Sequence, residues 1–136
     1  MTVRAHADAV LALLAAAPGN PLRVLDGAVP TGTNPPYVLL YFGDEDPELP
    51  DSRPLEGTSG RFVLRVYAHS VGGNAAAARA LGERVRAALL DVTPAIVGRA
   101  CFPIRREEGS PPQRDESTGT LVMDRVDIYR LESLPA

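Results

Sequence analysis

Helical periodicity is confined to two segments of this chain, and that limits the folds open to it. Residues 2–17 repeat apolar side chains such as Val10 and Leu14 at helical spacing, and Pro18 ends the pattern. The second segment, "AAAARALGERVRAALLDV", follows Asn74, a residue type that favours the N-cap position. Its alanines and leucines are spaced for one buried face. We therefore expect two amphipathic helices.

Most of the remaining patterned sequence is typical of β-strands. Short apolar or alternating segments, bounded by turn residues, occur at 21–27, 37–42, 58–70, 101–108 and 120–132. The segment "YVLLYF" is apolar at every position, which predicts an inner strand with both faces covered. The polar residues 113–116 are a candidate for one further short strand.

These elements predict a single α+β domain that spans residues 1–136. The expected order is α-β-β-β-α-β-β, with roughly five strands in a mainly antiparallel sheet. Two helices are too few to cover both faces of such a sheet, so we expect both to pack on one face. The other face is then open to solvent or to a partner.

The face away from the helices is expected to be polar, charged and aromatic. Strand alternation predicts that Val126 and Ile128 of the last strand face the core. It predicts the same for Phe102 and Ile104 of the strand before it. The alternate positions then belong to the open face: Arg61, Arg65, Tyr67, His69, Arg105, Arg125, Asp127 and Tyr129. Such a face is either simply solvated or a packed polar interface, because interfaces are enriched in Arg and Tyr.

Charge and cysteine content narrow the possible partners. The chain has 17 acidic and 14 basic residues, a net charge of −3, and every basic residue is Arg. This balance disfavours wrapping of nucleic acid. Cys101 is the only cysteine, which excludes an internal disulfide and favours assembly in the cytosol. No apolar run is long enough for a signal peptide or a membrane span, so no membrane association is expected.

An acidic run is the strongest local candidate for chemistry. "YFGDEDPELPD", residues 41–51, contains Asp44, Glu45, Asp46, Glu48 and Asp51. An EF-hand loop needs Gly at its sixth position and Glu at its twelfth, but a frame that starts at Asp44 has Leu49 and Leu55 there. The pattern therefore favours a solvated or docking loop over a metal cradle, and a looser calcium site is the alternative.

No catalytic arrangement stands out elsewhere. His6, His69 and Cys101 do not have the spacing of zinc ligands. "GTSG" lacks the spacing of a nucleophile elbow and precedes a strand instead of a helix. "HSVGGNAAAARA" has neither a P-loop nor a dinucleotide fingerprint. We therefore expect a protein that is not an enzyme and has no metal or cofactor.

The order and spacing of several segments carry a family resemblance over nearly the whole chain. These are the N-terminal Ala/Leu helix, "RVLDGAVP" followed by "PPYVLLY", "RFVLRVYAHSVGGNAAAARALGERVRAALL", and the block from "CFPIRREEGSPPQRDES" to "VMDRVDIYRLES". In this order they resemble the tail terminator (tail completion) proteins of long-tailed bacteriophages, particularly those that infect actinobacteria. That family has an antiparallel sheet with two helices on one side, which agrees with the layers expected from periodicity.

The resemblance implies a structural virion protein. Such proteins assemble in the host cytoplasm into a ring, usually hexameric, at the head–tail junction. The ring caps the tail tube, ends its polymerisation and joins it to the head connector. The implied partners are further copies of the chain, the tail tube protein and a head–tail connector protein. Double-stranded DNA passes through the lumen without specific binding.

A closed ring joins two different patches of neighbouring subunits, and charge complementarity fixes their register. The expected subunit and tube interface consists of Asp44, Glu45, Asp46, Glu48, Arg61, Arg65, Tyr67, Arg105, Arg125, Asp127 and Tyr129. Three alternatives stay open: another head–tail joining (stopper or neck) ring protein, a small metal-binding module that uses residues 44–51, and a ligand-binding domain that dimerises through its sheet.

Overall fold

A computed structural model describes residues 2–45, 60–117 and 119–136. Its elements are, in order, α1 (Thr2–Ala15), β1 (Val24–Asp26), β2 (Tyr37–Glu45), β3 (Phe62–Gly72), α2 (Ala75–Leu89), β4 (Arg99–Cys101), β5 (Arg105–Gly109), β6 (Gln113–Asp115) and β7 (Val122–Pro135). The strands form one seven-stranded sheet, antiparallel except where β1 pairs with β2. The α+β class is confirmed, with more strands than the sequence suggested.

The longest strand, β7, organises one half of the sheet. β3 pairs along one side of β7, while β4, β5 and β6 pair with successive parts of its other side. The strand expected at 101–108 is therefore two short strands, separated by a segment that contains Pro103, which has no N–H to donate to a ladder. Ile104 is buried as expected, but Phe102 is 45% exposed, so its inward assignment was wrong.

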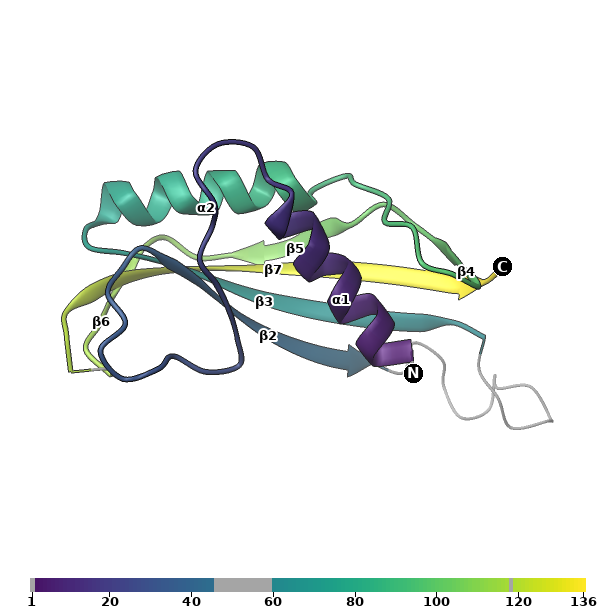
Figure 1. Ribbon diagram of the computed structural model, residues 1–136, viewed down its shortest axis with the longest axis horizontal. Helices are drawn as coiled ribbons and strands as arrows, with labels where there is room; N and C mark the ends of the chain where they lie inside the picture. The colour runs from purple at the N-terminus through teal and green to yellow at the C-terminus, as the bar shows by residue number, and fades with distance from the viewer. Residues whose placement is uncertain (1, 46–59, 118) are drawn as a thin grey trace.

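Both helices pack on the same face of the sheet, as expected. In Figure 1, α2 runs along the sheet and α1 crosses in front of it. A single buried cluster unites Val10 of α1 and Val85 of α2 with Leu64 and Val66 of β3. α2 begins where Asn74 caps it, because the Asn74 side chain accepts the Ala77 N–H at 2.8 Å.

A smaller apolar cluster lies on the opposite face. It joins Tyr37 and Leu39 of β2 to Val71 and Val122, with Val29 packed against them. Because strand side chains alternate, these residues point away from the neighbouring core residues of β2. The inner-strand expectation for "YVLLYF" is confirmed where β2 lies between β1 and β3, but Tyr41 at its far end is 43% exposed. The connection between β1 and β2 covers one end of the helix-free face.

The side-chain orientation expected for β7 was wrong. Pairing with β3 places Asp127 beside Ala68 and Tyr129 beside Val66, and both β7 residues are fully buried on the helix side. Arg125 points the same way, towards α2. Val126 and Ile128 consequently face the opposite side. Val126 and Ile128 were expected in the core because they are apolar. The core instead holds the Asp127 carboxylate, which is tolerated there because two arginines neutralise its charge.

Candidate functional site: the helix-free sheet face

The helix-free face carries a row of arginines across neighbouring strands. Arg65 of β3 pairs in register with Arg130 of β7, which in turn pairs with Arg105 of β5. Like charges directly opposite one another destabilise a sheet unless counter-ions intervene. The neighbouring carboxylates therefore determine whether this row can persist in the folded chain.

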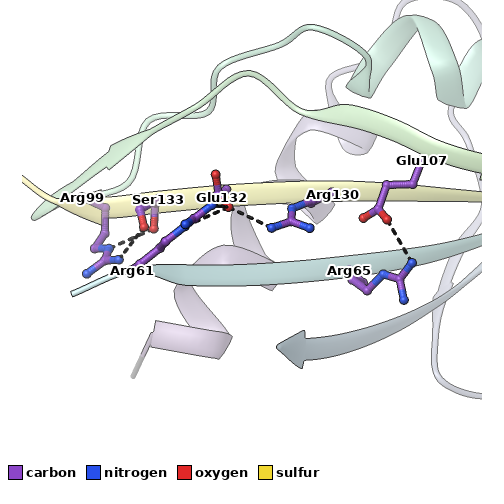
Figure 2. A network of polar contacts seen from close by, with 7 residues as sticks. All are labelled: Arg61, Arg65, Arg99, Glu107, Arg130, Glu132 and Ser133. Carbon is purple, nitrogen blue, oxygen red and sulfur yellow. Dashed lines mark hydrogen bonds and ion pairs between the residues drawn. The ribbon is translucent and has the colours of Figure 1, made fainter. Parts of the chain in front are cut away.

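Carboxylates pair with each of these arginines. Glu132 accepts hydrogen bonds from Arg61 at 2.6 Å and from Arg130 at 3.0 Å, as Figure 2 shows. Glu107 accepts one from Arg65 at 3.0 Å. Arg105 forms an ion pair with Asp91, just after α2. Three groups of ion pairs thus hold the guanidinium groups of this row, called the arginine ladder below, in place.

Glu132 is the centre of this ladder. Burial alone raises its pKa, but hydrogen bonds and charge from Arg61 and Arg130 outweigh burial and hold the pKa below its usual value of 4.5. Because the folded-state pKa lies below the unfolded value, Glu132 stabilises the fold above pH 4.5, and this contribution is lost as the pH falls through the folded-state pKa.

We expect Glu132→Gln to lower the free energy of unfolding at pH 7 by about 1–2 kcal/mol, because the amide loses both charge-assisted bonds. Urea denaturation at pH 7 and at successively lower pH measures this difference, which should shrink once Glu132 is protonated in both states. Glu116→Gln is the control, since Glu116 is well exposed and, among the described residues, pairs with Arg114 alone. An equal effect in the two variants would refute the central role of Glu132.

Exposed aromatic side chains flank the arginine ladder. Phe102 lines a hollow of about 220 Å³ together with Arg105, Arg130 and Glu132. On the other side of the row, the Arg65 guanidinium lies 5.8 Å from the centre of the Tyr67 ring. Tyr41, paired in register with Tyr67, is 43% exposed. Rigid rings beside fixed arginines are typical of protein interfaces.

A second hollow, of about 320 Å³, lies at the far end of this face. Tyr37, Tyr41, His69, Asp115 and Asp124 are among its lining residues. His69 Nδ1 is 2.9 Å from Asp124 Oδ2 and its ring meets Tyr41 edge-on. Burial and the nearby carboxylates raise the pKa of the Tyr37 hydroxyl, so this phenol stays protonated at neutral pH.

The described part of the chain holds no group of three or more His, Cys, Asp or Glu residues arranged to bind a metal. Asp44 is exposed at the end of β2. Asp46, Glu48 and Asp51 lie outside the described residues, and so does most of "GTSG" at 57–60.

No helix among the described residues is long and apolar enough to cross a membrane.

Comparison with known proteins identifies the family to which this fold belongs. Residues 1–122 match the family model described as "Tail completion protein gp17". The chain belongs to this family. No curated protein matches the sequence.

Two solved structures share the fold of this tail completion protein. One is a chain from the "Virion of native gene transfer agent (GTA) particle", with 19% identity and a TM-score of 0.58 over 93% of this chain and 84% of that chain. The second has 16% identity and a TM-score of 0.58, and the alignment covers 98% of this chain and 96% of that chain. At these identities the likeness shows the fold alone, while the family match supports a structural role in the phage tail.

Outside the acidic run, the expected interface residues of this tail completion protein fall into two groups. Arg61, Arg65, Tyr67 and Arg105 belong to the helix-free face, as expected. Arg125, Asp127 and Tyr129 do not, because they point under α2. Burial raises the pKa of Tyr129 to about 12, and the Asp127 charge adds to the rise.

Sequence reasoning overlooked several polar residues of the ladder. Arg130 and Glu132 occupy alternate positions of the last strand, so a one-residue shift in the assignment of that strand would have found them. The exposed Phe102 was missed for a similar reason, since an aromatic residue in a strand suggests the core. No sequence signal indicates the buried bond of 2.7 Å between His6 and Ser133, which lie at opposite ends of the chain.

Proposed function

We propose that this tail completion protein forms a ring, hexameric as is usual for tail terminators, that caps the tail tube. The ring ends polymerisation of the tube and joins it to the head connector at the head–tail junction, after assembly in the host cytoplasm. The observation that carries the proposal is the helix-free face, where fixed arginines lie between exposed aromatic rings. Family membership supports the same role.

The helix-free face is suited to docking because its polar groups are already ordered. The ion pairs around Glu132 and Glu107 restrict the arginine side chains before any partner arrives. Pre-ordered side chains lose less conformational entropy on binding. The proposed interface consists of Arg61, Arg65, Tyr67 and Arg105 on this face and of Asp44, Glu45, Asp46 and Glu48 in the acidic run. We include Tyr41 and Phe102 in the proposal because both are exposed beside the arginines.

The proposed role needs no catalysis and no cofactor. It requires complementary surfaces on the tube protein, on the connector protein and on neighbouring copies. DNA must pass through the ring without being held, and a protein with a net charge of −3 discourages phosphate binding overall. Specificity then resides in protein–protein contacts at the ring's two rims and between its subunits.

Loss of the protein tests the capping role directly. In a phage that lacks it, we expect tail tubes of uncontrolled length that do not join heads, because nothing ends polymerisation. Electron microscopy of the lysate measures the length distribution. Purified protein should restore uniform tails, and mass measurement on tail-bound protein should show a closed ring. Tubes of normal length that merely fail to join heads would favour the alternative, a stopper or neck protein.

Two variants test the helix-free face in the same complementation experiment. Phe102→Asp and Tyr41→Asp should fold normally, because both side chains are substantially exposed, yet fail to complete tails. Val97→Asp is the matched control, since Val97 is fully exposed in the turn before β4 and lines neither hollow of this face. Full complementation by both face variants would show that the helix-free face does not contact the tube.

A further inference from the structure

The helix side of the sheet carries an arginine-lined pocket that the proposed tube contact does not use. Its volume is about 380 Å³, and it lies between α2 and the connection from β5 to β6. Three arginines from three elements line it, with a wall of small and rigid residues: Arg79, Arg106 and Arg125, with Ser110, Pro111 and Pro112.

The pocket has more positive charge than its own carboxylates neutralise. Asp127 is shared by two guanidinium groups, at 2.8 Å from Arg106 and 3.1 Å from Arg125. Glu83 offers only a 3.3 Å contact to Arg125 and is 63% exposed, so water screens it. Arg79 forms no ion pair or side-chain hydrogen bond within the described chain, which leaves its guanidinium available.

The donors in this pocket suit a carboxylate. Ser110 Oγ accepts the Val126 N–H, so its hydroxyl hydrogen is free to donate to an incoming oxygen. Arginine is the side chain best adapted to two-point contact with a planar carboxylate. A Cβ at position 109 would overlap Arg106, so glycine is required for Arg106 to lie in this place.

We propose that this arginine pocket binds carboxylates of the acidic run, residues 44–51, from a second copy of the chain. The inference rests on the proposed ring and identifies the contact that joins its subunits. The run supplies five carboxylates, the strongest negative charge in the sequence, to match the uncompensated arginines.

Asp44, where the acidic run begins, and the arginine pocket lie towards opposite ends of the sheet. Asp44 pairs with Leu64 near the start of β3, whereas Arg125 pairs with Ser70 near its end, about 20 Å further along an extended strand. Figure 1 shows β2 running away from the end of the sheet at which α2 begins. Patches at opposite ends suit a head-to-tail contact, which closes into a ring when the rotation between copies allows it.

A peptide experiment tests the pocket without requiring the ring. The probe is a synthetic peptide of residues 43–51, "GDEDPELPD", added to isotopically labelled full-length protein and followed by NMR. We expect saturable shifts at the Ser110 amide and at the side-chain Nε–H signals of Arg106 and Arg125. The control peptide "GNQNPQLPN" has the same shape without charge and should leave these signals in place.

Matched arginine variants localise the binding. Arg79→Gln should weaken the peptide affinity about fivefold or more, because one charge-assisted contact is lost. Arg86→Gln should bind like wild type: Arg86 is also exposed on α2 and also lacks an ion pair in the described structure, but it does not line the pocket. Equal loss in both variants, or equal binding of the uncharged peptide, would overturn the proposal.

Two further outcomes distinguish a contact between copies from a phosphate site. Binding of inorganic phosphate or duplex DNA in the pocket, with no binding of the acidic peptide, would overturn the second-copy assignment and identify a phosphate site. A cross-link supports the assignment when an Arg79→Cys copy joins an Asp46→Cys copy in a Cys101→Ser background and an Arg86→Cys copy does not. If the peptide binds but the protein fails to cap tails, the capping function fails and the contact stands.

Discussion

Asp127→Ala is expected to lower the free energy of unfolding by about 3–5 kcal/mol, because it leaves two arginines without their shared buried counter-ion. The Asp127 carboxylate is 1% exposed and is contacted by Arg106 and Arg125. Arg125 is itself only 11% exposed, so its charge cannot recover full hydration when the carboxylate is removed. Urea denaturation at pH 7, monitored by circular dichroism, measures the loss.

The same arginine provides a control for Asp127. Glu83→Ala also removes a carboxylate from Arg125, but this one is exposed, and its loss should cost less than about 1 kcal/mol. Similar effects of the two substitutions would show that Asp127 is not a buried charge that the fold depends on. An Asp127→Ala protein as stable as wild type would contradict the packing of β7 against α2.

Gly72→Ala is expected to destabilise the fold by about 2–3 kcal/mol through overpacking. Gly72 ends β3, and only Gly73 and Asn74 separate it from α2. A Cβ at Gly72 would lie 2.6 Å from the Ala78 backbone nitrogen and 2.9 Å from the Ala77 carbonyl carbon. Both neighbours are backbone atoms of the first turn of α2, so the helix would have to move away from the sheet. Thermal or urea denaturation detects this.

The adjacent glycine is a precise control. A Cβ at Gly73 meets no atom within 4 Å, and the residue is exposed. Gly73→Ala should therefore change stability by less than about 0.5 kcal/mol. If the two alanine variants were equally stable, close approach of β3 and α2 would not be the reason for glycine at position 72.

The elements that sequence reasoning located correctly share a local physical cause. Asn74 begins α2 because a short polar side chain satisfies a free N–H at the first turn, and that chemistry depends on neighbouring residues alone. The helical faces around Val10 and Val85 follow from apolar spacing. The family, too, was recognisable from the order of segments, as the match over residues 1–122 confirms.

The orientation of β7 does not follow from its local sequence. The side chains of this strand alternate between two sets, and each set mixes apolar with charged residues. One set has Val126 and Ile128 with Arg130, and the other has Tyr129 and Leu131 with Asp127. Local pattern therefore cannot choose between the faces. Pairing of Leu131 with Leu64, and the arrival of Arg106 from β5 beside Asp127, decide the matter. Neither contact is visible in the local sequence of β7.

The sequence by itself determined the α+β layers, the two helices, most of the strands and the family, because each depends on periodicity, turn residues or segment order. Only the tertiary structure decided which charges are buried, that Phe102 is exposed, and that Arg125 lines a pocket under α2 instead of the open face. The reason is that the side of a strand with mixed composition is chosen by its neighbours, since buried charge is tolerated only where a counter-ion from another element meets it.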